Sequence, residues 1–296
     1  MEKITVFTPS YNRAYCLHHL YNSLCEQTSK DFIWLIVDDG SIDNTKTLVD
    51  KWIQEKLIGI KYIYKVNGGM HTAHNVAYDN ITTELNVCID SDDRMPINAI
   101  ESILHCWEGV REDSKIVGMV GLDVDLKGNL IGSKLPNNIK NSKFHLLYQK
   151  YGVNGDKKVV LRSKFIEKDL RYPEYKGEKL VPLGWLYNEL DNQYYYACFN
   201  EVWVEVDYQV DGSSASINNQ YFKSPRGFRF SKIQQYNNST VYKYRVRALV
   251  HFGFTSIILK DYLFFMKSPN PFMSFILTPL SILFYIKSRV KKSVSK

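Results

Sequence analysis

The chain has 296 residues, of which 45% are hydrophobic and 14% aromatic, so it can bury a substantial core and is not a disordered protein. Its five cysteines are odd in number and show no Cys-x-x-Cys spacing, which argues against a disulfide framework or a zinc knuckle and fits a reducing cytoplasm. The net charge of +7 is unevenly distributed, because residues 223–296 carry 14 Lys/Arg against one acid, whereas residues 1–222 carry 24 Lys/Arg against 30 Asp/Glu.

The first third of the chain alternates short β-rich runs with segments of helical periodicity. Apolar residues recur at helical spacing in 17–24 and 48–53, a short helix is predicted after Gly68-Gly69, and a longer one from Pro96 to about Trp107. This alternation predicts an α/β fold, with a doubly wound, mostly parallel sheet flanked by helices. The predicted strands are Ile4–Phe7, Phe32–Val37, Ile60–Tyr64, Leu85–Ile89 and Ile116–Val120.

The basic C-terminal region, 223–296, contains two apolar runs, Phe252–Met266 and Phe272–Ile286. The second run is interrupted by Pro279, and its 15 residues fall short of the roughly 20 that a membrane-spanning helix needs. Lys and Arg flank both runs, which is typical of a helical segment on an anionic membrane surface, and we prefer this interpretation to nucleic-acid binding. A pair of core helices with a solvated basic end is the alternative.

The N-terminal run Ile4–Phe7 begins directly after Met1-Glu2-Lys3, which leaves no room for a signal peptide. Together with the basic, apolar C-terminal region, this predicts a cytoplasmic protein. We expect peripheral association with the inner face of the cell membrane.

Polar motifs follow three of the predicted strands, at 8–12, 38–41 and 90–93. In parallel α/β sheets ligands bind beyond the carboxyl ends of the strands, so we expect these motifs to meet at one crevice. Acids after strands also serve as helix caps, and Asp43 or Asn44 is expected to be one. Capping accounts poorly for all three motifs together.

Asp90, Asp92 and Asp93 crowd one strand end, which is electrostatically expensive unless a cation offsets their repulsion. Hard oxygen ligands suit Mg²⁺ or Mn²⁺, and such an ion stabilises a diphosphate leaving group. On the neighbouring strand end, Asp38 and Asp39 can accept hydrogen bonds from a base or a ribose, and the following Gly40 permits a sharp turn or a close approach of the backbone. Tyr11 offers an aromatic face for the base. These residues predict a nucleoside pocket.

In this order, four motifs resemble those of glycosyltransferase family 2, which has the GT-A fold: ITVFTPSYNR, FIWLIVDDGSIDNT, NGGMHTAHN and LNVCIDSDD. The resemblance covers about residues 1–125 and implies an inverting transfer from a nucleoside-diphosphate sugar, usually UDP-linked, to a glycan or lipid-linked acceptor. It implies that Pro9, Tyr11, Asp38 and Asp39 hold the base and ribose. Asp92 and Asp93 would then serve ribose or phosphate and the metal, with Asp90 leading the motif.

Two further parts of the site follow from the same resemblance. The stretch Asn67–Asn75 resembles the loop and helix beside the donor, where Asn67 and His74 would contact the donor or, for the histidine, simply pack. The general base for an inverting displacement would come from the second half of the chain, and Glu178 in YKGEKLVP is the candidate. Glu174, Glu189 and Asp191 are its rivals.

The resemblance also divides the chain by role. Residues 1–125 would form the nucleotide-sugar half of the GT-A domain, 126–222 its acceptor half, and 223–296 a helical membrane-associating appendage. A nucleotidyltransferase is the alternative enzyme, although TPSYNRAYC lacks the glycines of a triphosphate loop. A catalytically inactive nucleotide-sugar-binding module is the alternative from another class, because Met70 and Lys179 depart from the family pattern.

Overall fold

The computed structural model describes residues 2–166, 168–207 and 217–294. The chain forms two compact units: Met1–Leu170 with Gln193–Gln209, and Arg171–Asn192 with Val210–Lys296. The boundaries expected at residues 125 and 222 divide the chain by role rather than by packing, and they stay predictions.

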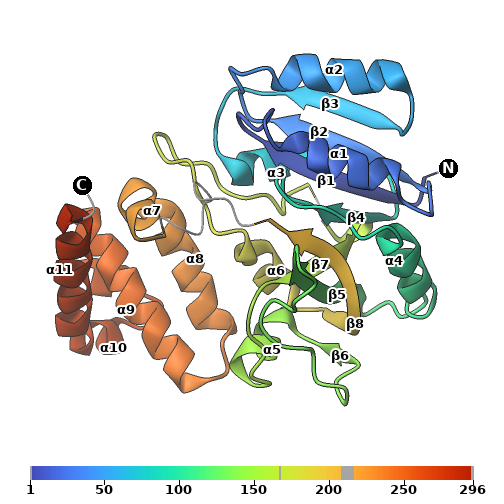
Figure 1. The fold of residues 1–296 in the computed structure, drawn as a ribbon. Coiled ribbons are helices and arrows are strands. Elements are labelled where there is room, and N and C mark those ends of the chain that lie inside the picture. The colour runs from blue at the N-terminus through green and yellow to red at the C-terminus, as the bar shows by residue number, and fades with distance from the viewer. Residues whose placement is uncertain (1, 167, 208–216, 295–296) are drawn as a thin grey trace. The chain divides into compact units, whose positions relative to one another are not determined.

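Within the described residues, one sheet of eight strands forms the first unit, in the order β3-β2-β1-β4-β7-β5-β8-β6 (Figure 1). The strands β1 to β4 run parallel, as do β5 and β8, whereas β7 is antiparallel to both of its neighbours and β6 is antiparallel to β8. The predicted α/β fold with a mostly parallel sheet flanked by helices is confirmed. The strands are β1 Ile4–Ser10, β2 Phe32–Asp38, β3 Ile60–Tyr64, β4 Leu85–Cys88, β5 Ile116–Asp125, β6 Asn141–Ser142, β7 Lys157–Arg162 and β8 Tyr195–Val206.

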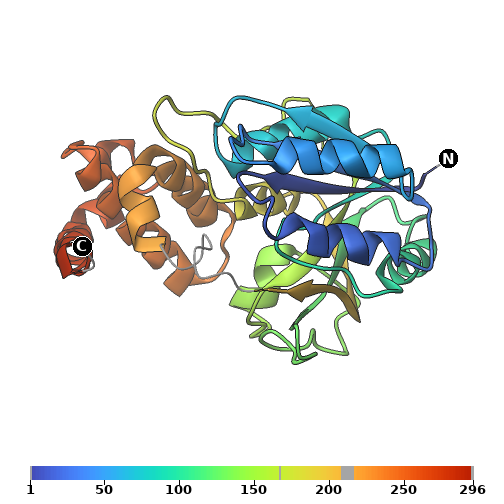
Figure 2. The ribbon, with the colours of Figure 1, turned by 45° about the horizontal axis from the view of Figure 1, so that its top comes forward.

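Helices cover both faces of this sheet (Figures 1 and 2). Apolar residues of α1, α2 and α4 pack in one cluster with Ile4, Val6 and Trp34, whereas α3 packs on the opposite face, where His74 meets Phe7. Burial on both faces explains why β1 reads as a nearly continuous apolar run. The helices of this unit are α1 Leu17–Cys25, α2 Thr45–Glu55, α3 Met70–Asn80, α4 Ala99–Glu108 and α5 Phe144–Gln149.

Two helix starts test the sequence predictions directly. Asp43 accepts hydrogen bonds from the N–H and hydroxyl of Thr45, the first residue of α2, at 3.1 and 2.6 Å. The N-cap position itself is Asn44, whose side chain makes no capping hydrogen bond, so side-chain capping by Asn44 is not observed. The helix predicted to start at Pro96 begins at Ala99, because the intervening residues form a turn in which the Ala99 N–H donates to the Pro96 carbonyl at 2.9 Å.

The second unit is helical. Its α9 packs against both α8 and α11 (Figure 1). Among residues 2–166, 168–207 and 217–294, no helix combines the length and apolarity that crossing a membrane requires. The helices are α6 Gly184–Leu190, α7 Ile217–Lys223, α8 Pro225–Asn238, α9 Tyr242–Ile258, α10 Pro271–Ile276 and α11 Thr278–Val294, with a 3₁₀ turn at Phe264–Lys267.

Candidate active site

The strand ends that carry the polar motifs lie at one edge of the sheet. Ser10, the last residue of β1, is in register with Asp38 of β2, and Asp38 is in register with Tyr64 of β3. On the other side of β1, Phe7 pairs with Cys88, the last residue of β4. Because these four strands run parallel, their carboxyl ends share an edge. That the polar motifs line one crevice at this edge stays a prediction.

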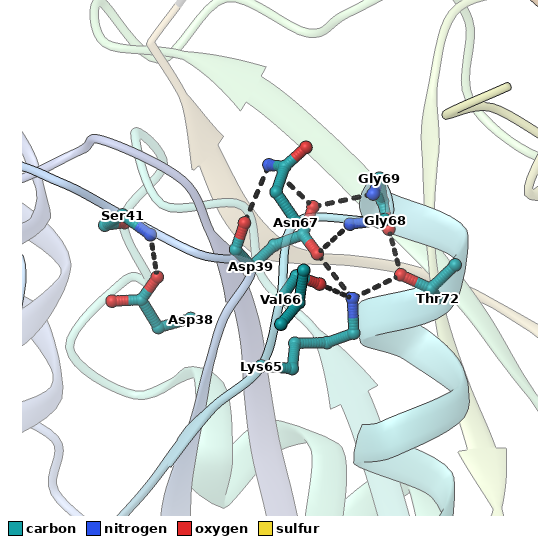
Figure 3. A network of polar contacts seen from close by, with 9 residues as sticks. All are labelled: Asp38, Asp39, Ser41, Lys65, Val66, Asn67, Gly68, Gly69 and Thr72. Atoms are coloured by element: carbon teal, nitrogen blue, oxygen red, sulfur yellow. Dashed lines mark hydrogen bonds and ion pairs between the residues drawn. The ribbon is translucent and has the colours of Figure 1, made fainter. Parts of the chain in front are cut away.

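Asp39 is the centre of a polar network that closes the loop before α3 (Figure 3). Its carboxylate accepts hydrogen bonds from the N–H groups of Gly68 and Gly69 at 2.8 and 2.7 Å and forms an ion pair of 2.6 Å with Lys65. The Asn67 amide donates to the carbonyl of Asp39 at 2.7 Å and to its carboxylate at 3.2 Å. The carboxylate therefore places negative charge at the N-terminus of α3, where free N–H groups attract an anion.

Gly40 allows this network to form. Its φ of +86° lies in the left-handed region, and a Cβ at this position would come within 2.8 Å of the backbone nitrogen of Asn67. The predicted sharp turn at Gly40 is confirmed, and the backbone that comes close to it is that of Asn67. Lys65 also donates to the hydroxyl of Thr72 in α3 and to the carbonyl of Val66, each at 2.7 Å, so its ammonium joins the loop to α3 and to Asp39.

Asp38 ties the loop after β2 to the sheet. It is 1% exposed, and its two carboxylate oxygens accept hydrogen bonds from the Ser41 N–H at 2.7 Å and from the Tyr62 hydroxyl at 2.6 Å. Asn12, at the end of β1, joins the same loop: its N–H donates to Ser41 Oγ at 2.8 Å and its Oδ1 accepts from Ile42 at 2.9 Å. These contacts hold the first two strand ends together.

Tyr11 and Pro9 belong to the same strand end but differ in exposure. Tyr11 is 47% exposed, whereas Pro9 is buried within β1. The tyrosine ring is thus accessible to a planar ligand, and the proline shapes the strand beneath it. Their contact with a base stays a prediction.

Asp90, Asp92 and Asp93 follow β4 in a tight turn. The Asp93 N–H donates to the Asp90 carbonyl at 3.1 Å, and the Asp93 carboxylate accepts from the Asp207 N–H at 3.3 Å. Asp93 is 4% exposed, whereas Asp90 and Asp92 are half-buried. Burial and the Asp90 carboxylate raise the pKa of Asp92, and burial with both neighbouring carboxylates raises the pKa of Asp93. Their negative charges therefore repel one another, and this repulsion favours a bound cation.

Two charged residues that no sequence pattern indicated join this cluster. Lys158 of β7 donates to the carbonyl of Cys88 at 3.3 Å, and Asp123 of β5 is 2% exposed. Burial alone would lower the pKa of Lys158, but the carboxylates of Asp123, Asp90 and Asp93 raise it above its usual range. The ammonium is therefore a fixed positive charge among the acids.

His74 lies in the packed face of α3. It is 1% exposed, its Nδ1 is 3.2 Å from the Tyr78 hydroxyl, and its Nε2 is 3.5 Å from the Cys88 sulfur. Burial lowers the pKa of His74 to about 3, so the imidazole is neutral at physiological pH. These contacts describe packing, and a contact of His74 with a donor stays a prediction.

Glu178, the candidate base, belongs to the second unit and sits at the start of α8. One carboxylate oxygen accepts from the N–H groups of Arg226 and Gly227 at 2.9 and 3.0 Å, and the other accepts from Arg226 at 3.1 Å. The Arg226 guanidinium adds an ion pair at 3.5 Å. Glu178 therefore caps this helix with its charge, whatever else it does. Of its rivals, Glu189 accepts from the Gln234 amide at 2.6 Å and Asp191 is 1% exposed.

The family model described as Glycosyl transferase family 2 matches residues 5–167. Over 158 residues the chain is 28% identical to the poly(ribitol-phosphate) beta-N-acetylglucosaminyltransferase TarP of Staphylococcus aureus, an alignment that covers 50% of this chain and 47% of TarP. The first curated relatives are all longer, and the chain spans less than half of their length.

Two solved structures resemble the fold. S. aureus TarS 1–349 in complex with UDP-GlcNAc superimposes with a TM-score of 0.62 and 17% identity, over 97% of this chain and 79% of that one. The mannosyltransferase PcManGT from Pyrobaculum calidifontis, in complex with GDP-Man and Mn²⁺, superimposes with a TM-score of 0.55 and 14% identity, over 99% of this chain and 76% of that one. At these identities the likeness concerns the fold alone.

Proposed function

Because this chain belongs to glycosyl transferase family 2, we propose that it transfers a sugar, with inversion, from a UDP-linked donor to a glycan or lipid-linked saccharide in cell-surface polysaccharide synthesis. The observation that carries the proposal is the set of carboxylates at the shared edge of β1, β2 and β4. Charges that raise one another's pKa and lie at strand ends are typical of a functional site.

The similar proteins support a proposal for the donor class. TarS is described in complex with UDP-GlcNAc, and TarP is named as a beta-N-acetylglucosaminyltransferase. PcManGT is described with GDP-Man and Mn²⁺. We therefore favour a UDP-N-acetylhexosamine as donor, with a GDP-sugar as the alternative, and the sugar itself depends on the shape of its pocket.

We assign nucleotide binding to residues 1–125. Tyr11 offers the exposed ring for the base, and Pro9 supports that strand end. Asp38 and Asp39 already accept hydrogen bonds from their own chain, so their main contribution is to hold the loops around the nucleoside. Asn67 is fixed by Asp39 at the start of the loop before α3.

The metal would be held at the end of β4. Among the described residues, no three His, Cys, Asp or Glu side chains form a group that could hold an ion by themselves. This fits Mn²⁺ or Mg²⁺, which are commonly bound by one or two carboxylates together with substrate phosphates. Half-buried Asp92 is the leading ligand, buried Asp93 is the second, and half-buried Asp90 is the first acid of the motif. When bound, the ion would offset the charge of the departing diphosphate.

The general base would come from 126–222, the acceptor half. We keep Glu178 as the candidate, because its carboxylate is ordered by three hydrogen bonds and is 7% exposed. An inverting transfer needs such a group to take the proton of the acceptor hydroxyl.

A donor screen tests the function. The purified chain is incubated with UDP-, GDP- and dTDP-sugars with and without Mn²⁺, and nucleotide release is measured. We expect Mn²⁺-stimulated release of UDP from a UDP-N-acetylhexosamine and little release from the other donors. Release of pyrophosphate from a nucleoside triphosphate would favour a nucleotidyltransferase instead. Binding of UDP without turnover of any donor would favour an inactive binding module.

We further propose that 223–296 places the enzyme on the cytoplasmic, anionic face of the membrane. The helices α10 and α11 bury serines and expose apolar side chains: Ser274 and Ser281 are 0% and 1% exposed, whereas Phe272 and Phe275 are 74% and 62% exposed. A surface helix in water normally shows the reverse pattern. The apolar surface comprises Tyr262, Leu263, Met266, Phe272, Phe275, Ile276, Leu280, Ile282, Leu283, Ile286 and Val290.

Positive charge accompanies this apolar surface. The exposed cations within the same stretch are Lys260, Lys267, Lys287 and Arg289, and its one acid, Asp261, is ion-paired with Arg229 and Lys267 at 3.1 and 2.9 Å. Apolar side chains that enter the lipid boundary beside cations that meet its headgroups are the pattern of an interfacial helix.

Replacing Phe272 and Phe275 together by Ser should lower binding to vesicles that contain phosphatidylglycerol by about tenfold or more, because each buried Phe contributes roughly 2 kcal/mol. Vesicle flotation measures this, and Leu57→Ser, at an exposed apolar site in the first unit, is the control. Unchanged binding of the double variant would contradict the membrane assignment. So would a concentration-dependent oligomer that the same variant abolishes, because the surface would then join copies of this chain.

A further inference from the structure

Lys158 brings a positive charge to the acidic strand end from a distant part of the chain. It lies in β7, the antiparallel strand between β4 and β5. Its ammonium is 3.3 Å from the carbonyl oxygen of Cys88, two residues before Asp90. Among the described residues this carbonyl is its sole hydrogen-bond acceptor, so two of its three N–H groups have no acceptor there.

Asp123 lies on the same side of the sheet. Lys158 pairs with Gly121 of β5, and Asp123 is two residues further along that strand, so it occupies the diagonal position on the same face. It is 2% exposed, and within the described part of the chain its Oδ1 has no hydrogen-bond partner. A buried carboxylate with an open oxygen would be costly without a nearby cation, and Lys158 supplies one.

We propose that Lys158 is the resident cation of the donor site: it offsets the charge of Asp90, Asp93 and Asp123, and it gives its remaining N–H groups to the donor diphosphate. The inference rests on the proposed function and adds a positioning residue to it. A permanent ammonium at this place offsets part of the negative charge that the carboxylates gather at the end of β4. It also attracts an anion to the end of β4, where the carboxylates of Asp90 and Asp93 would repel one.

The positive charge of Lys158 weakens the binding of a cation and strengthens the binding of an anion. Removing it should strengthen the binding of a divalent metal, because the local potential becomes more negative. The same change should weaken the binding of a diphosphate when metal is absent. A residue that only supports the fold would weaken both, so the pair of measurements separates the two roles.

The test uses the full chain with Lys158→Gln, which keeps a donor for the Cys88 carbonyl but removes the charge, and Lys158→Arg, which keeps the charge. Lys127→Met, in an exposed turn, removes the same charge elsewhere. Binding of Mn²⁺ alone is followed by electron paramagnetic resonance, and binding of UDP in EDTA by calorimetry. For Lys158→Gln we expect about tenfold tighter Mn²⁺ and about tenfold weaker UDP, whereas Lys158→Arg and Lys127→Met stay near wild type.

A double variant keeps the test decisive where Lys158→Gln folds poorly. Combining it with Asp123→Asn removes one charge of each sign, so Mn²⁺ affinity should return to within about threefold of wild type while metal-free UDP binding stays weak. If Lys158→Gln weakens the binding of both Mn²⁺ and UDP, or of neither, the proposal is overturned. A wild-type chain that binds neither Mn²⁺ nor UDP would overturn the proposed function itself.

Discussion

Replacing Asp92 by Asn is expected to lower Mn²⁺-stimulated UDP release by roughly 10²- to 10³-fold, because the charge that would hold the metal against the leaving diphosphate is lost. Asn has nearly the same size, so the turn between the Asp90 carbonyl and the Asp93 N–H should persist. Asp93→Asn should have an effect of the same order. Nucleotide release at saturating donor measures the loss.

Asp92→Asn should also stabilise the fold when metal is absent. The pKa of Asp92 in the folded protein is raised by burial and by the Asp90 carboxylate, so its ionised form is less favourable in the folded state than in the unfolded one. Near neutral pH the Asp92 carboxylate therefore lowers the free energy of unfolding, and replacing it by the neutral Asn removes this loss. The melting temperature in EDTA should rise for Asp92→Asn but not for Glu112→Gln, at a 94% exposed side chain. Normal turnover in both aspartate variants would remove these acids from the site.

Replacing Glu178 by Gln is expected to lower kcat by about 10²- to 10⁴-fold, as loss of a general base does. Hydrolysis of the donor serves as the assay when the acceptor is unknown, because water then takes the place of the acceptor hydroxyl. Substrate affinity should change much less than kcat, since a base acts mainly in the transition state.

The capping role of Glu178 predicts a second, separate effect. Gln retains an oxygen that can accept from Arg226 or Gly227 but loses the charge at the start of α8, so stability should fall by about 1–2 kcal/mol. Denaturant unfolding measures this loss, and Glu189→Gln, at a rival acid of the same unit, is the control for activity. A stability loss with unchanged kcat would leave Glu178 as a helix cap alone, and loss of turnover in Glu189→Gln would make that residue the base.

The strands β1 to β4 and the acids at their ends were predictable because both depend on local patterns. The strands β1, β2 and β4 are largely buried and mostly apolar along their length, and charged residues come at or after their ends. Parallel strands also bring their carboxyl ends to one edge, so Asp38 and Asp90 lie at the same edge of the sheet, on either side of β1, for a topological reason alone. The sharp turn at Gly40 followed from its residue type.

The partners of those acids were not predictable in the same way. Asp39 reads as a ligand contact in the sequence, yet in the structure Gly68, Gly69 and Lys65 engage its carboxylate. From the sequence, Glu178 is expected to be a base. In the structure its carboxylate caps α8, a helix that begins nearly fifty residues later in the chain. Hydrogen bonds over such separations depend on which loops meet, and composition does not encode that.

By itself the sequence determined the fold class, the acidic edge of the sheet and the apolar, basic character of the C-terminal region, because each rests on short-range periodicity or composition. Only the tertiary structure decided that β7 inserts antiparallel between β4 and β5 and brings Lys158 and Asp123 beside the acids. It also decided that α10 and α11 bury Ser274 and Ser281, while Phe272 and Phe275 of α10 are exposed. Strand order and helix rotation are set by long-range packing, in which each side chain competes for burial against the whole unit.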